Sequence, residues 1–454
     1  MDLIPSEILL HIFGYIDGPA PSDSGLHDQP RIESLTMRPG WLEPPLKAAS
    51  LVSRSWRCLV LSRLFTRILW KPDVFTLTGF TFDPIPLLRF LVDNRLERGV
   101  VTFTMIVDFF DPANMDYQFA SQIRTTDLEW LWDQLFSVID PLRFTILARP
   151  TTLATLLSRR SYFDDGWPFN TPYHILSLAR VTRQAMAKDS SGHIQRPTGS
   201  QIQLENSEDS ASMGSGPITP TAPAPSSASR RPATYLPLRL GIASRCPLLT
   251  IRPWTSLLLN EGSSAKVYYE CLPFLCRLPS ILSILLGCER YPSTAPLIPQ
   301  TVVDFNYIAI FPRPSHFEIL LQYLPRINRL FVQLAPKPEN GILENTNEME
   351  HINPAEMWKE LNTSYNFLMR KLTTVPNPRA NWSFLRVFES GDAVGAGAWG
   401  AVIQILENSS IREWKVERQG VLVRHLGSDE LSDGSSEVND DVGNFSNASY
   451  LMTA

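Results

Sequence analysis

A glycine-rich stretch near the end of the chain has a spacing that could cradle phosphate groups. Gly395, Gly397 and Gly400 fit the pattern G-x-G-x-x-G, which together with Val402 is shared by dinucleotide-binding turns and the glycine loop of kinases. A kinase also needs a lysine on a following strand, a His-Arg-Asp loop and an Asp-Phe-Gly triplet, and none of these follows. A dinucleotide site needs an acidic residue about 20 positions on. Glu417 lies near that position, but the predicted sheet is almost complete there. We therefore expect a loop before a helix, and keep a nucleotide-binding enzyme using the 395–400 loop as an alternative.

Other residues with catalytic chemistry lack companions. Residues 263–266 match S-x-x-K, but no Ser-Asp-Asn or Lys-Thr-Gly triplet accompanies them. The aspartate pairs Asp108 with Asp111 and Asp164 with Asp165 offer carboxylates, although aspartates at such spacing are typical of turns and helix caps. The seven histidines are scattered, and none has another His or a Cys at metal-binding spacing. We predict no catalytic residue, no metal site, no cofactor and no enzymatic activity of this chain alone.

The composition favours a folded protein of the cytoplasm, the nucleus or both. A hydrophobic fraction of 44% supports a large core, while a net charge of −5 disfavours binding to nucleic acid. Residues 1–7 do not resemble a signal peptide. The most apolar stretch, residues 272–288, contains Arg277, Pro273 and Pro279, so we expect a buried helical segment there and no membrane contact. Five cysteines without framework spacing indicate a reducing compartment.

Two segments have compositions that disfavour folding. Residues 188–233 are rich in Ser, Thr, Pro and Gly and read as a disordered linker or insertion. Residues 426–454 form an acidic, Ser-rich tail without Lys or Arg. The remaining sequence divides into an amino-terminal block, residues 1–70, and the two parts of a second region, residues 71–187 and 234–425.

The second region alternates short apolar runs with amphipathic stretches. This order favours a mostly parallel sheet with right-handed crossovers. The spacing of Leu, Ile and Val over residues 320–334 resembles a leucine-rich repeat unit. A degenerate leucine-rich-repeat-like solenoid and an ordinary α/β domain both remain open. We predict strands at residues 101–107, 142–148, 305–311, 327–334, 384–389 and 411–416, and helices at residues 128–139, 316–324, 355–372 and 399–406.

The amino-terminal block is predicted to be helical. Its first helix has Pro5 in the first turn and an apolar face with Ile8, Leu9 and Ile12. Residues 17–45 are rich in Pro, Gly, Ser and Asp and read as a long internal loop. A second helical stretch begins near Leu46.

This block resembles the F-box family, and its internal loop resembles a group of fungal F-box proteins. The matching residues are Ile4-Pro5-Ser6-Glu7-Ile8-Leu9, then Leu51-Val52-Ser53-Arg54-Ser55-Trp56, then Leu64-Phe65. The family has Leu before the proline, where this chain has Ile4, and the loop between its helices is shorter. A three-helix module this small cannot bury all its apolar surface alone. The resemblance implies that the leftover side chains bind a Skp-type adaptor, and it assigns this contact to Ile4, Pro5, Ile8, Leu9, Ile12, Leu51, Val52, Trp56 and Leu64.

The resemblance implies a non-catalytic role. The expected fold class is α+β and multi-domain: a three-helix F-box followed by an α/β region. The chain would act as the substrate receptor of a Skp–cullin–F-box ubiquitin ligase, with the adaptor linking it to a cullin and residues 71–425 holding an unidentified target protein. The alternative within the family is an F-box adaptor that works outside a ligase.

Overall fold

The computed structural model describes residues 4–36, 45–72, 83–108, 125–159, 173–183, 246–263, 280–288, 295–349, 353–374, 381–393, 396–409 and 413–425. All of them belong to one compact unit, made of residues 1–183 and 244–454. The predicted linker at 188–233 and the predicted tail at 426–454 lie outside the described residues.

The amino-terminal block is helical, as predicted. Ser53 begins the last of its helices, because its hydroxyl accepts a hydrogen bond from the backbone N–H of Trp56 at 3.1 Å. The block contains α1 (Ser6–Ile16), α2 (Pro21–Ser24), the 3-10 turn η1 (Gly25–His27), α3 (Ile32–Thr36), α4 (Pro45–Val52) and α5 (Arg54–Leu64).

A single ten-stranded sheet follows, in the order β1-β2-β3-β4-β5-β6-β7-β8-β10-β9. Five neighbouring pairs are parallel, and the four antiparallel pairs involve β4 on both sides and β10 on both sides. The mixed α/β class with a mostly parallel sheet is therefore confirmed. The strands are β1 (Arg67–Trp70), β2 (Thr102–Val107), β3 (Arg143–Ala148), β4 (His174–Ala179), β5 (Ser256–Ser263), β6 (Asp304–Ile310), β7 (Arg329–Gln333), β8 (Val387–Ser390), β9 (Trp414–Arg418) and β10 (Val421–Arg424).

Helices connect successive strands, and proline often begins them. Pro150, Pro247, Pro314 and Pro354 occupy the first turn of four of these helices, where proline loses no backbone hydrogen bond. The connecting elements are α6 (Ile85–Asp93), η2 (Glu97–Gly99), α7 (Thr125–Val138), α8 (Pro150–Leu156), α9 (Pro247–Thr250), α11 (Ile281–Leu286), α12 (Pro314–Tyr323), η5 (Pro338–Asn340), α13 (Thr346–Met349), α14 (Pro354–Thr373), η6 (Asn381–Phe384) and α15 (Ala396–Asn408).

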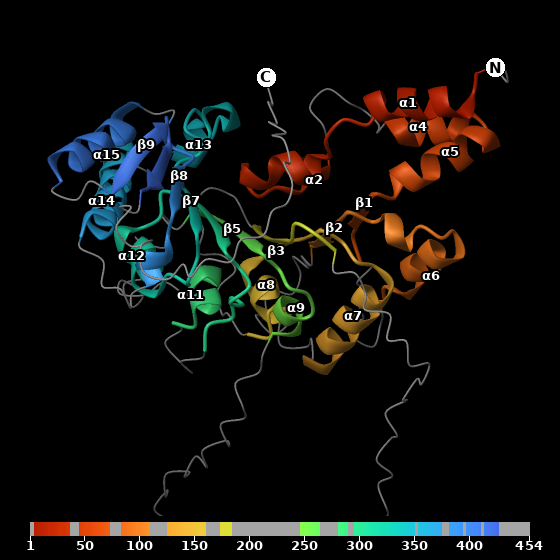
Figure 1. Ribbon diagram of the computed structural model, residues 1–454, viewed down its shortest axis with the longest axis horizontal. Helices are drawn as coiled ribbons and strands as arrows, with labels where there is room; N and C mark the ends of the chain where they lie inside the picture. Colours follow the sequence, from red (N-terminus) through yellow and green to blue (C-terminus); the bar gives the residue numbers. More distant parts are fainter. Residues whose placement is uncertain are drawn as a thin grey trace, which may run out of the picture. The chain divides into compact units, whose positions relative to one another are not determined.

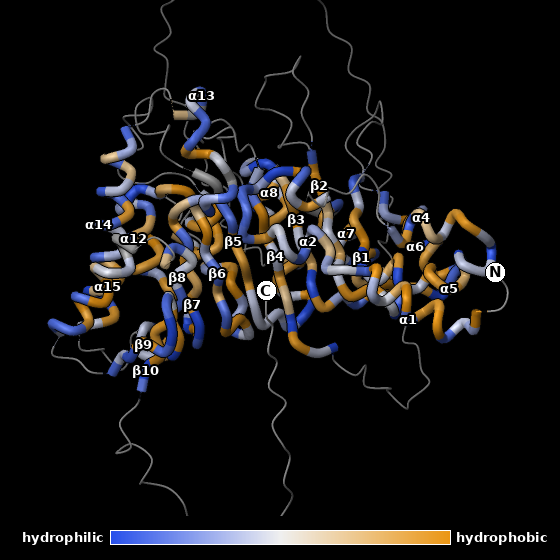
Figure 2. The backbone as a smooth tube through the Cα atoms, turned by 90° about the horizontal axis from the view of Figure 1, so that it is seen from above, coloured by the Kyte–Doolittle hydropathy of each residue, from blue (hydrophilic) through white to orange (hydrophobic). Residues whose placement is uncertain are grey.

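The two faces of the sheet carry separate apolar cores. The larger core lies between the sheet and its connecting helices, and Leu257 and Leu259 of β5 belong to it. Leu258, between them, belongs to the smaller core on the opposite face. Figure 1 shows α7, α8, α9 and α11 on one side of the strands and α2 on the other. Because the strands follow one another in chain order, right-handed crossovers place successive helices on the same face. Figure 2 shows long hydrophobic stretches in the central strands, which are buried on both faces.

The repeat-like sequence at residues 320–334 forms one helix–strand unit. Its apolar positions lie at the end of α12, in the turn, in β7 and directly after β7, and all are buried in the larger core. They are Leu320, Leu321, Leu324, Ile327, Leu330, Val332 and Leu334.

The structure corrects several sequence-based expectations. β1, β4, β5 and β10 were not predicted, and β9 lies about two residues beyond the strand expected at 411–416. Residues 17–45, expected as a loop, contain α2, η1 and α3 in their described part. These elements are three to five residues long, too short to show helical periodicity, and Leu26 and Leu35 are buried against strands that are distant in the sequence.

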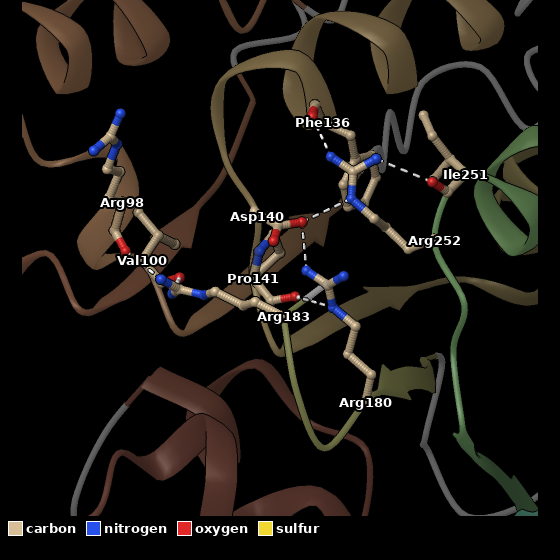
Figure 3. A network of polar contacts seen from close by, with 9 residues as sticks. All are labelled: Arg98, Val100, Phe136, Asp140, Pro141, Arg180, Arg183, Ile251 and Arg252. Carbon is tan, nitrogen blue, oxygen red and sulfur yellow. Dashed lines mark hydrogen bonds and ion pairs between the residues drawn. The ribbon is translucent and has the colours of Figure 1, made fainter. Parts of the chain in front are cut away.

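An arginine network joins the turns at one end of three central strands (Figure 3). The Asp140 carboxylate, just before β3, contacts the guanidinium groups of both Arg180 and Arg252, the latter at 2.8 Å. Arg180 also donates to the carbonyl of Pro141 at 3.2 Å, and Arg252 to the carbonyl of Phe136. Because Arg180 follows β4 and Arg252 precedes β5, the network ties three consecutive strands together.

Candidate partner-docking site

The helices α1, α4 and α5 have a small core of their own. Leu9 and Phe13 of α1 are buried with Leu46 of α4 and Val60 of α5. Trp56 packs edge-on against Phe13, with ring centroids 5.2 Å apart. Arg57 of α5 donates to the carbonyl of Ser50 in α4 at 3.1 Å. These contacts hold the three helices as one module.

The predicted docking residues divide into two groups around this core. Leu9 is buried in it, at 8% exposed, and Trp56 and Leu64 are half-buried against it. The others are exposed to solvent: Ile4, Pro5, Ile8, Ile12, Leu51 and Val52. We call these six the docking patch.

The exposure of the docking patch is high for such side chains. Ile8 is 52% exposed, Leu51 66% and Val52 59%. Ile8, Ile12 and Tyr15 recur at helical spacing along α1, and Tyr15 was not predicted as part of the site although it is strongly exposed. A set of large apolar side chains concentrated on one small module is typical of a surface that binds another protein.

A second candidate surface lies on the sheet face opposite the connecting helices. Register places six side chains in one row across β2 to β7: Ile106, Leu147, Ile175, Asn260, Ile308 and Gln333. Four are aliphatic, and the two amides interrupt an otherwise hydrophobic row. Both amide residues are buried. No sequence signal for this row exists, because register depends on how distant strands pair.

Residues 20–36, which we call the cover segment, lie on this row. Leu26 and Leu35 complete the smaller core with aliphatic residues of the row. The His27 ring stacks on Phe331 with centroids 4.8 Å apart. Asp23 contacts Arg67, the first residue of β1, at 3.4 Å, and Asp28 forms an ion pair with Lys337, which follows β7, at 2.8 Å.

A buried polar cluster lies on the other side of the sheet, beneath α11 and α12. The Glu261 carboxylate accepts hydrogen bonds from the Leu282 backbone N–H at 3.0 Å and the Tyr307 hydroxyl at 3.2 Å. His316 Nε2 lies 3.1 Å from the same carboxylate. Burial alone would raise the pKa of Glu261, but the hydrogen bond and charge of His316 outweigh it, so the pKa is lowered. Burial lowers the pKa of nearby His174 to about 4. The cluster joins β5, β6 and two helices, which gives it a structural role.

The described part of the glycine pattern is helical and does not form the expected loop. Gly397 and Gly400 lie within α15, which begins at Ala396, whereas Gly395 lies outside the described residues. A phosphate cradle requires a turn before the helix, with amide groups free to face the ligand. The helical placement therefore counts against a nucleotide site.

Of the other carboxylate candidates, Asp108 lies within the described residues. Asp108 accepts a hydrogen bond from the Tyr173 hydroxyl at 2.5 Å and lies 3.6 Å from Lys71, which are structural contacts. Asp111, Asp164 and Asp165 lie outside the described residues, and so does Lys266 of the S-x-x-K match.

The described residues contain neither a candidate metal site nor a candidate membrane-spanning helix. Within the described ranges, no group of three or more His, Cys, Asp or Glu side chains is placed to hold a metal ion. In that same part of the chain, no helix combines the length and apolar character needed to cross a membrane. No family model, no curated protein and no solved structure matches the chain.

Proposed function

We propose that this chain is an F-box substrate receptor of a Skp–cullin–F-box ubiquitin ligase. The observation that carries the proposal is the docking patch, where residues that the F-box resemblance assigns to adaptor contact are exposed around a buried core. The chain itself would perform no chemistry. It would bring a target close to the ubiquitin-conjugating subunits, which act in the cytoplasm and nucleus.

The energetics of the docking patch fit this role. Complete burial of a Leu, Ile or Val side chain is worth roughly 1.5–3 kcal/mol, and a few such residues usually dominate an interface. Ile8, Leu51 and Val52 are each more than half exposed, so burying them against an adaptor would supply several kcal/mol.

The sheet is proposed to hold the target protein. Strands β1 to β8 follow one another in chain order with connecting helices on one face, an order that a leucine-rich-repeat-like solenoid would also have, and residues 320–334 contain one helix–strand pair. The antiparallel β4 departs from a regular repeat, so the proposed solenoid is a degenerate one. The face of the sheet opposite the connecting helices is the one proposed for the target, and in this structure residues 20–36 lie on it.

A capture experiment tests the docking claim. Full-length chain carrying Ile8→Ser, Leu51→Ser and Val52→Ser would be compared with wild type for binding of the Skp-type adaptor and cullin. We expect a loss of at least a hundredfold in adaptor affinity, because three exposed anchors are removed. The matched control replaces two equally exposed valines outside the module, Val92→Ser and Val416→Ser, and should bind normally.

The outcomes separate the two family roles. Capture of adaptor and cullin by wild type and control, but not by the triple variant, supports the receptor role. Capture of adaptor without cullin would favour an adaptor that works outside a ligase. A folded wild-type chain that captures neither would contradict both. Leu9 and Trp56 are unsuitable for this test, because they contribute to the core of the module.

A further inference from the structure

Two buried side-chain amides hold the backbone of the cover segment. The Asn260 side-chain amide donates to the carbonyls of Leu26 at 3.0 Å and Asp28 at 2.7 Å. The Gln333 amide lies 3.5 Å from the carbonyl between them, that of His27. The side-chain amides of two buried residues thus lie within hydrogen-bond distance of three consecutive backbone carbonyls. Backbone carbonyls are common to every peptide, so these contacts do not require this particular sequence.

Side chains of the cover segment supply the sequence-dependent contacts, and among them the His27 ring stacks on Phe331 with the centroids 4.8 Å apart. Leu26 is buried among the aliphatic residues of the row, and Asp28, two positions later, forms the 2.8 Å ion pair with Lys337. Both Asp28 and Lys337 are about one-third exposed. The surface therefore accepts an aliphatic side chain, then a ring that stacks on Phe331, then a carboxylate.

The cover segment also has internal structure that does not depend on the sheet. The backbone N–H groups of Asp23 and Ser24 donate to the carbonyl of Ala20, and that of Asp28 donates to Gly25. A Cβ at Gly25 would lie 2.5 Å from the carbonyl oxygen of Ser34, so glycine is required where η1 meets α3. The segment contains no strand, so its displacement would leave every strand pairing of the sheet intact.

We propose that the row across β5 to β7 is a peptide-binding surface, and that residues 20–36 are its resident occupant. The visiting partner is a protein segment with an aliphatic residue, a histidine or aromatic residue and then an acidic residue, which displaces the cover segment and takes over its contacts with Asn260, Gln333 and Lys337. The inference rests on the proposed function only in naming this visitor a ligase target.

Native-state hydrogen exchange tests whether the cover segment opens alone. We expect the amides of Asp23, Ser24 and Asp28 to exchange at least tenfold faster than the amides of β5 to β7. Asn260→Leu, which replaces the amide with an aliphatic side chain like its neighbours, should accelerate exchange in the cover segment about tenfold and leave the strands unchanged. Exchange of the cover segment together with the strands would overturn the proposal, because the segment would then be part of the cooperative core.

A peptide-binding experiment tests the surface itself. The probe is a fluorescent peptide with the sequence of residues 20–36, and the receptor is the full chain carrying Leu26→Ser and Asp28→Ser, which weaken the resident. We expect this variant to bind the peptide at least tenfold more tightly than wild type. A peptide carrying the same two changes should not bind.

The ion pair provides a charge-reversal control. Adding Lys337→Glu to the weakened receptor should abolish binding of the normal peptide and restore it for a peptide with Asp28→Lys alone. Binding that ignores this reversal, or no binding to a receptor whose cover segment exchanges faster, would overturn the proposal. Adaptor capture is independent of both experiments, so a failed F-box assignment would not be mistaken for a failed peptide site.

Discussion

At the scale of single residues, the buried polar groups are the informative ones. His174 is fully buried on β4, next to the Glu261 cluster, and its pKa is lowered to about 4 by burial. The unfolded chain therefore binds a proton at this residue below about pH 6.5, whereas the folded chain does not until about pH 4. Stability attributable to His174 is complete above this window and is lost as the pH falls through it.

This difference predicts acid sensitivity. Between pH 7 and 4 the free energy of unfolding should fall by about 3 kcal/mol because of His174 alone. His174→Gln should flatten this part of the profile, measured by urea denaturation at several pH values. His11→Gln, an exposed histidine on α1, serves as the control and should leave the slope unchanged. An unaltered slope in His174→Gln would show that another group carries the pH dependence.

At the scale of elements, α1 contains both residues that stabilise the amino-terminal module and residues proposed to bind the adaptor. Phe13 is buried in the module core, whereas its neighbour Ile12 is exposed in the docking patch. Phe13→Ala should destabilise the module by about 3–5 kcal/mol, because it leaves a cavity in a small core. Ile12→Ala should change stability by less than about 0.5 kcal/mol and still weaken adaptor binding. Thermal unfolding and adaptor titration of both variants would measure this; equal destabilisation would contradict the assignment.

The arginine network connects three strands of the sheet, because Asp140 precedes β3, Arg180 follows β4 and Arg252 precedes β5. Burial alone would raise the pKa of Asp140, but the hydrogen bonds and charges of Arg180 and Arg252 outweigh it and hold the pKa below its ordinary value. Asp140→Asn should cost roughly 2–4 kcal/mol, because it leaves the buried Arg180 guanidinium without its counter-charge. Asp304→Asn, at a half-exposed ion pair of 3.8 Å, should cost less than about 1 kcal/mol. Chemical denaturation of the two variants provides the comparison, and similar losses would show that burial is unimportant here.

At the scale of the whole molecule, one compact unit is built from residues on both sides of a long internal connection. β4 ends at Ala179, β5 begins at Ser256, and these two residues are paired in the antiparallel register. Replacing residues 188–233 with about ten Gly and Ser residues should leave the thermal midpoint unchanged or slightly higher, because closing a shorter connection costs less conformational entropy. Calorimetry would test this. A fall of more than about 5 °C would show that the replaced residues contribute to the core.

The sequence by itself determined the elements whose signals are local. Strands β2, β3 and β6 and helices α7, α12 and α14 were all predicted close to their observed bounds, because apolar runs and helical periodicity are properties of neighbouring residues. The candidate docking residues were also predicted from local spacing, and the structure separates them into core and exposed groups. Their role in binding an adaptor stays a prediction.

Only the tertiary structure decided the features that depend on distant contacts. The direction of β4 and the cover segment on the sheet had no local signal, since Asn260 and Leu26 are separated by 234 positions. Asn260 is an unremarkable residue within an apolar run until strand register places it in the row and the chain returns its own carbonyls to it. Pairing over such distances is chosen by the combined burial of many side chains, which no single stretch of sequence contains.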